Sequence, residues 1–152
     1  MKPRVEIFPA STADLCDLVP MVEQYWRFES IEAFDAARVA VLLAKVIAQP
    51  TLGRVWLARV DDSAAAYLLA VYVFSLEHQG MTAEIDEFFV MPGYRRLGLG
   101  GQLLKTAEQA FRADGCTKVA LQIGRDNTAA RAFYRRHGYG DRAGFELVDK
   151  TL

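Results

Sequence analysis

The chain is poor in the residues that cross-link proteins or bind transition metals. It holds two cysteines and two histidines among 152 residues. Cys16 and Cys116 are far apart in the sequence and form no C-x-x-C pair, so they predict no disulfide scaffold. His78 and His137 have no zinc-like spacing to either cysteine. We therefore expect no metal, and thiols that stay reduced as in the cytoplasm.

An excess of positive charge is also missing. Lys and Arg number 18 and Asp and Glu number 19, so the net charge is −1. Binding to nucleic acid or an anionic membrane through a general basic field needs a larger positive balance. No apolar run approaches the roughly 18 residues of a membrane span, and the N-terminus lacks the apolar segment of a signal peptide. These absences predict a cytoplasmic protein with no nucleic acid partner and no membrane partner.

The chain does have enough apolar residues for a sizeable core, because 52% of it is hydrophobic. At this length we expect one domain over residues 1–152. Period-2 alternation and continuous apolar runs predict strands, whereas apolar residues at helical spacing predict helices. The predicted strands are residues 5–8, 54–60, 67–76, 83–90, 118–124 and 145–148, and the predicted helices begin at Ser11, Ser30, Gly98 and Asn127.

The order of these elements, β-α-α-β-β-β-α-β-α-β, predicts the fold class. Three antiparallel strands lead into a β-α-β crossover, which makes strands 83–90 and 118–124 parallel. We therefore expect an α/β fold with a single mixed β-sheet, in which antiparallel N-terminal strands precede a parallel central pair, with helices on both faces. Ligands of such sheets bind beyond the carboxyl ends of the parallel strands.

A glycine-rich stretch follows the first strand of this parallel pair. Glycines within residues 98–101 let a ligand approach the backbone N–H groups at a helix N-terminus, where the helix dipole favours an anion. Arg95 and Arg96 add charged donors. The stretch is not a P-loop, because no Lys-Ser or Lys-Thr follows the glycines. It is not a dinucleotide fingerprint either, because Leu103 stands where a third glycine is needed. A pyrophosphate would suit this stretch, and a tight turn that happens to be basic is the alternative.

Two motifs resemble one enzyme superfamily. Arg95-x-x-Gly98-x-Gly100 resembles the acetyl-coenzyme A signature Q/R-x-x-G-x-G/A of the GNAT superfamily of N-acetyltransferases. The segment NTAARAFYRRHGY, residues 127–139, resembles its element N-x-x-A-x-x-F-Y-x-x-x-G-F/Y. Since the element order agrees as well, the chain is identified as a member over nearly its whole length. The resemblance implies a GNAT-type fold, an acyltransferase activity and acetyl-CoA as the cosubstrate.

The resemblance also implies roles for particular residues. Tyr134 occupies the position of the acid that protonates the leaving thiolate. Asn127 occupies a position that contacts coenzyme A, and it also suits an ordinary helix N-cap. The implied coenzyme-binding residues are Phe88, Phe89, Val90, Arg95, Arg96, Leu97, Gly98, Leu99, Gly100, Gly101 and Asn127.

Transfer to an amine needs a base, because an alkylammonium group with a pKa of about 10.4 is protonated at neutral pH. Strand alternation predicts that Glu84 and Asp86 share one face, and that Glu87 points the other way with Ile85 and Phe89. Histone-acetylating members of the superfamily carry a base glutamate at the position of Glu84, and diamine acetyltransferases carry one at that of Asp86. Both residues are candidate bases, and solvated surface carboxylates are the alternative.

Two sequence features bear on the branch of the superfamily. Gln122 stands where the ribosomal-protein acetylating branch has a glutamate, and a glutamine cannot act as a base, so that branch loses support. The segment IDEFFVMPGYRRLGLG, residues 85–100, is most similar to the diamine acetyltransferase-like group. This similarity favours a small cationic amine as the acceptor.

Four residues at the end of the first predicted helix, Tyr25, Trp26, Phe28 and Glu29, are the candidate acceptor-binding residues. Aromatic rings beside a carboxylate hold an ammonium group by cation–π and Coulomb attraction, although the same rings also suit a core. Three functions stay open: acetyl transfer to a small cationic amine, transfer to a protein or peptide amine, and a non-catalytic acyl-CoA-binding module. No motif determines the acceptor, the acyl group or the oligomeric state, although many superfamily members form homodimers.

Overall fold

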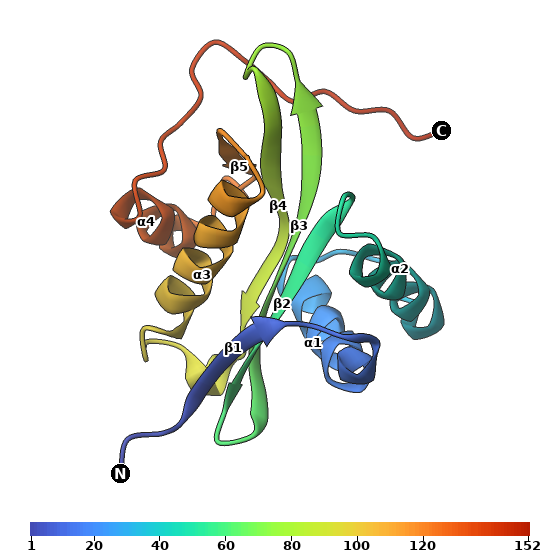
Figure 1. Ribbon diagram of the computed structural model, residues 1–152, viewed down its shortest axis with the longest axis vertical. Helices are drawn as coiled ribbons and strands as arrows, with labels where there is room; N and C mark the ends of the chain where they lie inside the picture. The colour runs from blue at the N-terminus through green and yellow to red at the C-terminus, as the bar shows by residue number, and fades with distance from the viewer. The chain divides into compact units, whose positions relative to one another are not determined.

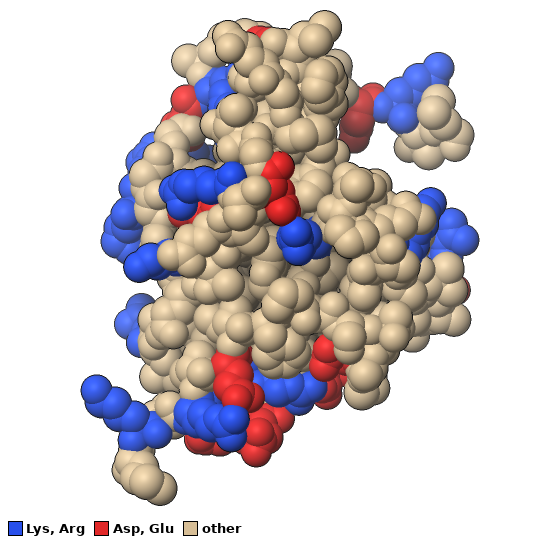
Figure 2. Space-filling view, viewed as in Figure 1, with Lys and Arg blue, Asp and Glu red and all other residues tan.

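The computed structural model describes residues 1–152, which form two compact parts, Met1–Gln122 and Ile123–Leu152. Each part is described by itself. None of the helices combines the length and the apolar character that crossing a bilayer requires. Figure 2 shows that charged side chains of both signs occupy only part of the visible face, and that most of this face is formed by other residues.

The first part is a five-stranded sheet with three α-helices. The strands lie in the order β1-β2-β3-β4-β5; neighbours from β1 to β4 are antiparallel, and β4 and β5 are parallel. The predicted α/β fold with one mixed sheet is therefore confirmed. The elements are β1 (Val5–Pro9), α1 (Leu15–Phe28), α2 (Ala36–Ala48), β2 (Gly53–Val60), β3 (Ser63–Ser75), β4 (Gly80–Val90), α3 (Leu99–Ala113) and β5 (Val119–Leu121), with 3-10 turns at Thr12–Asp14 and Pro92–Tyr94.

Helices cover both faces of this sheet, with α1 and α2 on one side and α3 on the other (Figure 1). β3 is buried on both faces because its residues 66–70 are almost all apolar and alternate between the two cores. Tyr67 and Leu69 belong to the core under α1 and α2. On the α3 side, the rings of Trp56 and Phe111 pack edge to face with centroids 5.4 Å apart. Burial of each such side chain contributes about 1.5–3 kcal/mol, which holds β3 and its neighbour β4 firmly in place.

The second helix begins later than predicted. The N-cap of α2 is Asp35, whose carboxylate accepts a hydrogen bond from the Arg38 N–H at 2.9 Å. Ser30, the predicted cap, has a φ of 58° and lies in the turn after α1. An N-cap needs an extended backbone, so a left-handed Ser30 cannot serve, and that prediction is wrong.

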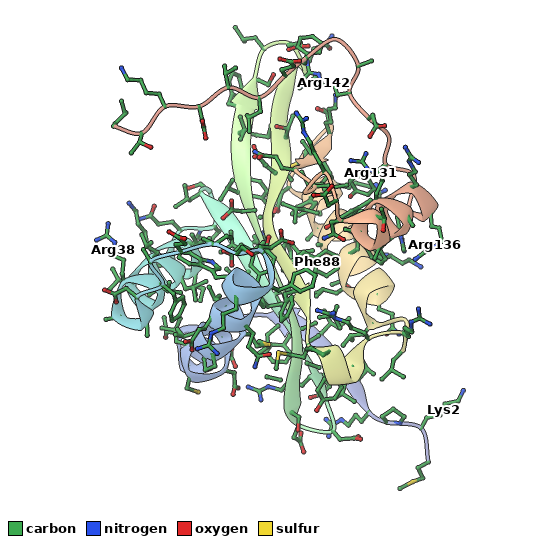
Figure 3. All side chains as sticks on the ribbon, turned by 180° about the vertical axis from the view of Figure 1, so that it is seen from behind. Lys2, Arg38, Phe88, Arg131, Arg136 and Arg142 are labelled. Carbon is green, nitrogen blue, oxygen red and sulfur yellow. The ribbon has the colours of Figure 1, made fainter.

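The second part contains one helix, α4 (Thr128–Arg136). Asn127 caps its N-terminus, accepting a hydrogen bond from the Ala130 N–H at 3.0 Å. Gly138 follows its C-terminus with a φ of 89°, a left-handed conformation that suits glycine. Arg131 and Arg136 project from this helix (Figure 3).

No strand forms at residues 145–148, so the prediction of a last strand is wrong. Phe145, Leu147 and Val148 are all exposed. Their apolar pattern is typical of a strand, but a strand is stable only where a neighbour completes its hydrogen-bond ladder. The sheet of the first part consists of β1 to β5, and the second part contains no strand.

Candidate functional site

A β-bulge in β4 decides where its carboxylates lie. Leu69 of β3 is opposite Glu87, whereas the next residue, Ala70, is opposite Ile85, so Asp86 is left without a partner. Because Leu69 and Ala70 point to opposite faces of the sheet, Glu87 and Ile85 do as well. The prediction that Glu87 and Ile85 share a face is therefore wrong.

The bulge also regroups Glu84. Its partner Val71 packs against the core under α1 and α2, as does Leu69, the partner of Glu87. Glu84 and Glu87 therefore share the face that α1 and α2 cover, and Asp86 is exposed at the bulge between them. Strict alternation, which put Glu84 and Asp86 together and Glu87 opposite, fails because the extra residue shifts the phase by one.

Glu87 is a half-buried carboxylate held at both oxygens. The Trp26 Nε1–H donates a hydrogen bond to its Oε1 at 2.6 Å, and the Tyr67 hydroxyl donates one to its Oε2 at 2.8 Å. Burial raises the pKa of Glu87, these two hydrogen bonds oppose the rise, and the charge of Asp86 adds to it. Glu87 takes part in none of the ion pairs of the protein. Its negative charge is thus held by neutral donors only.

Three of the four predicted acceptor-binding residues lie around this carboxylate in an aromatic cluster. Tyr25 and Phe28 both contact Phe89 of β4, with ring centroids 5.8 and 6.1 Å apart, and Tyr25 meets Tyr67 edge-on at 6.5 Å. The cluster comprises Tyr25, Trp26, Phe28, Tyr67 and Phe89. Phe28 remains 55% exposed, so the cluster presents an aromatic surface to solvent.

Negative charge converges on the same place. Burial raises the pKa of the Tyr25 phenol, and the charges of Glu29, Glu87 and Asp86 raise it further. Although the Asp86 side chain reaches solvent, the protein around it raises its pKa by desolvation. Neither Glu29 nor Asp86 forms an ion pair. The aromatic cluster is therefore edged by three carboxylates without counter-ions.

The loop after β4 leads into the N-terminus of α3, and the backbone N–H groups there have no hydrogen-bond acceptor within the protein. The first bond of the helix runs from the Gln102 N–H to the Gly98 carbonyl at 3.1 Å, and the N–H groups of residues 96–101 donate to no other part of the protein. Gly98 has a φ of 75°, a conformation in which an L side chain is strained. This row of free donors at a helix N-terminus fits a pyrophosphate.

Arg95 does not point away from the protein as a free donor. Its guanidinium carbon lies 5.2 Å from the centroid of Phe28 and 5.3 Å from that of Phe89, and its Nε–H donates to the Val90 carbonyl at 2.9 Å. Arg95 thus links the loop to the aromatic cluster by cation–π contacts. Arg96, which is exposed, makes no such contact.

The end of β4 has an open edge. β5 pairs with β4 only as far as Ile85 and Leu121, so the backbone of residues 86–90 pairs with β3 alone. Phe88 lies in this segment, on the middle of the sheet (Figure 3). The predicted coenzyme residues of β4 therefore form a strand edge that leads into the glycine loop. Within that loop Leu97 is exposed, whereas the Leu99 side chain is buried and leaves only its N–H for a ligand.

Tyr134 and Asn127 belong to the second part of the chain. Tyr134 is 8% exposed and packs between the rings of Phe133 and Tyr139, at 5.2 and 5.4 Å. The Asn127 side chain is engaged as the N-cap of α4. Their predicted roles toward the coenzyme stay predictions.

Sequence reasoning missed Glu87 and Tyr67 as members of the site. Regular alternation assigns Glu87 to the other face, and Tyr67 lies in a run of apolar residues that predicts only a core strand. One signal was present: Asp86 and Glu87 are adjacent in a strand whose other late residues are apolar. In a regular strand two adjacent side chains point to opposite faces, so adjacent charges in a sheet that is covered on both faces are a signal of a bulge.

Known proteins resemble this chain in sequence and in fold. The model of the acetyltransferase (GNAT) family matches residues 18–139. The chain is 25% identical over 148 residues to the uncharacterized N-acetyltransferase YhfO of Bacillus subtilis, with 93% of each chain covered. It is 28% identical over 138 residues to aminoglycoside N(6')-acetyltransferase type 1 of Acinetobacter haemolyticus, with 89% of this chain and 90% of the relative covered. The crystal structure of a possible acetyltransferase from Clostridium difficile 630 has the same fold, with a TM-score of 0.85, 17% identity, and coverage of 97% of this chain and 98% of that one.

Proposed function

We propose, since this chain belongs to the acetyltransferase (GNAT) family and is an acyltransferase, that it moves an acetyl group from acetyl-CoA to a primary amine of a small cationic acceptor. The observation that carries the proposal is the position of the Glu87 carboxylate, which Trp26 and Tyr67 hold within the aromatic cluster without an ion pair. Carboxylates without counter-ions beside exposed aromatic surface suit an ammonium group, through Coulomb and cation–π attraction. Tyr25, Trp26, Phe28 and Glu29 are accordingly proposed to bind the acceptor.

Acetyl-CoA, when bound, supplies the acetyl group as a thioester. The residues that fit it are those of the glycine loop, because the N–H groups of residues 96–101 have no acceptor in the protein and Gly98 has the backbone conformation of a close approach. Arg96 adds an exposed positive charge beside them. The open edge of β4 at residues 86–90 is proposed to hold the rest of the coenzyme.

Asp86 is proposed to accept the proton of the acceptor amine, through a water molecule. Desolvation raises the pKa of its carboxyl, which makes it a stronger base than an ordinary aspartate. Glu84 is the second candidate, since it lies half-buried on the same strand. Glu87 is a poorer candidate because both its oxygens already accept hydrogen bonds. Tyr134 is proposed to protonate the thiolate that leaves.

Two independent similarities favour a multiply charged amine. The Acinetobacter relative is named an aminoglycoside acetyltransferase, and aminoglycosides carry several amino groups. Residues 85–100 resemble the diamine acetyltransferase-like group. Both acceptor classes would place one amine for reaction while other ammonium groups meet carboxylates.

A thiol-release screen with acetyl-CoA tests the proposal. Polyamines and aminoglycosides are the expected acceptors, and amino acids and peptides are the contrasting ones. For the best acceptor, kcat/KM should rise with pH through an ionisation between about 6 and 9, because the amine must react in its neutral form. Turnover of peptides alone would assign the enzyme to protein or peptide acetylation, and no thiol release with any amine would refute the proposal.

A further inference from the structure

We infer that Glu87 is a positioning and charge-selecting residue of the acceptor site. Through Trp26 and Tyr67 it holds the last turn of α1 against β4, and its charge favours acceptors that carry a second ammonium group. This inference rests on the proposed function and deepens it.

The positioning role follows from what the carboxylate connects. Trp26 lies 61 residues before Glu87 in the sequence and Tyr67 lies 20 residues before it, so one side chain joins α1, β3 and β4. Trp26 is next to Tyr25, whose ring packs on Phe89. Glu87 therefore links the α1 half of the aromatic cluster to β3 and β4. Only the bulge makes this contact, because regular alternation would turn Glu87 to the α3 face.

The selecting role follows from the charges that face Glu87. On β4 its neighbour is Asp86, on α1 Trp26 donates to it and Tyr25 is near, and on β3 Tyr67 donates to it. All of these are acidic or neutral. The nearby cation, Arg95, is engaged by Phe28, Phe89 and the Val90 carbonyl and makes no ion pair with Glu87.

A half-buried charge without a counter-ion reduces stability, since no opposite charge offsets its desolvation. A glutamine at position 87 would accept from Trp26 and donate to Tyr67 without burying a charge. A glutamate is advantageous here where a ligand brings the missing positive charge. The geometry thus assigns the counter-ion of Glu87 to the acceptor.

Two substitutions separate the two roles. Glu87→Gln keeps the shape and both hydrogen bonds but removes the charge. Tyr67→Phe keeps the charge and the buried ring but removes one hydrogen bond to Glu87. Asp114→Asn is the matched control, because Asp114 is a carboxylate that also accepts from a β3 tyrosine, Tyr72, but lies in an ion pair with Arg54.

The probes are 1,4-diaminobutane and 4-amino-1-butanol, which have the same length but differ in the second positive charge. The readout is kcat/KM for each, its division into kcat and KM, and the KM for acetyl-CoA. The wild type should prefer the diamine, and Glu87→Gln should reduce that preference about tenfold through the KM for the diamine. Tyr67→Phe should keep the preference and raise both amine KM values alike. Asp114→Asn should keep the preference and both KM values.

An unchanged preference in folded Glu87→Gln refutes the inference while leaving the proposed function intact. A wild type without preference between the two amines refutes it as well. A wild type that releases thiol with no amine of the wider screen refutes the proposed function first, and the inference with it. If Glu87→Gln does not fold, Tyr67→Phe decides, because it keeps the charge of Glu87. If Tyr67→Phe raises KM for the diamine and also loses the preference over the amino alcohol, the preference comes from positioning alone and charge selection is overturned.

Discussion

Two carboxylates tie a helix to the sheet, one on each face, and they differ in their counter-charge. Glu87 accepts from Trp26 of α1 and Tyr67 of β3. Asp114, at the end of α3, accepts from Tyr72 of β3 and, at 2.6 and 2.9 Å, from both nitrogens of one edge of Arg54.

The chemical consequences are opposite. The hydrogen bond from Arg54 lowers the pKa of Asp114, whereas burial raises the pKa of Glu87. On the α3 face, burial raises the pKa of Tyr72 to about 12, so its hydroxyl stays a donor. Asp114 has a counter-ion within the protein, Arg54, and Glu87 has none. A carboxylate with its counter-ion is typical of structural stabilisation, whereas one without a counter-ion beside exposed aromatic rings favours a role in binding.

The largest expected effect concerns a third tyrosine. Tyr134→Phe should lower kcat roughly 10-fold to 1000-fold with little change in coenzyme affinity, because only the proton donor is removed. Tyr72→Phe is the matched control and should leave kcat unchanged. Steady-state kinetics and calorimetry with acetyl-CoA measure both quantities. Unaltered kcat with reduced thermal stability in Tyr134→Phe would make Tyr134 a structural residue, as Tyr72 is.

Asp86→Asn should lower kcat/KM roughly 100-fold, because the amide cannot accept the amine proton. Its melting temperature should not fall, since Asp86 has no hydrogen-bond partner at the bulge and its charge is unfavourably desolvated. Glu84→Gln is the comparison that decides between the two candidate bases. A larger loss of activity in Glu84→Gln would move the base to Glu84.

Asp114→Asn should reduce the free energy of unfolding by roughly 1–2 kcal/mol, because Arg54 loses a charged acceptor in a partly exposed pair. Glu87→Gln should leave the free energy of unfolding unchanged or increase it, because both hydrogen bonds remain and the desolvation cost disappears. Urea denaturation at neutral pH measures both. Equal destabilisation by the two variants would show that both ties are structural.

The smallest effect is the dependence of stability on pH. Asp114 has a lowered pKa in the folded state, so its stabilisation is present above its ordinary value of 3.8 and is lost as the pH falls through the lower value. Glu87 has a raised pKa, so its charge destabilises the fold as the pH rises from its ordinary value of 4.5 through the raised one. The free energy of unfolding is measured for the wild type and Glu87→Gln between pH 3 and pH 7. The difference between the two proteins contains the effect of Glu87, because the effect of Asp86 is present in both and cancels. A difference that does not change with pH would contradict the raised pKa.

Much of the fold could be predicted from the sequence because it depends on local patterns. The apolar runs of β2, β3 and β4 and the helical spacing in α1 and α3 act over a few residues. The order of elements from β1 to α4 and the parallel pair of β4 and β5 were therefore confirmed. The glycine loop was predictable for the same reason, since a left-handed Gly98 before a helix is a local feature. The tail at residues 145–148 has the local pattern of a strand but no neighbour to pair with, and there the pattern misled.

The sequence by itself determined the sheet, the glycine loop and the supply of carboxylates and aromatic residues around β4. Only the tertiary structure decided which of them meet. The bulge at Asp86 depends on the register of β4 against β3, and it turns Glu87 toward Trp26 and Tyr67. Arg95 likewise has the spacing of a phosphate-loop residue, yet the nearby rings of Phe28 and Phe89 hold its guanidinium. Periodicity assigns a side chain to a face only while the ladder is regular; one inserted residue reverses that assignment, and packing between distant segments selects where it occurs.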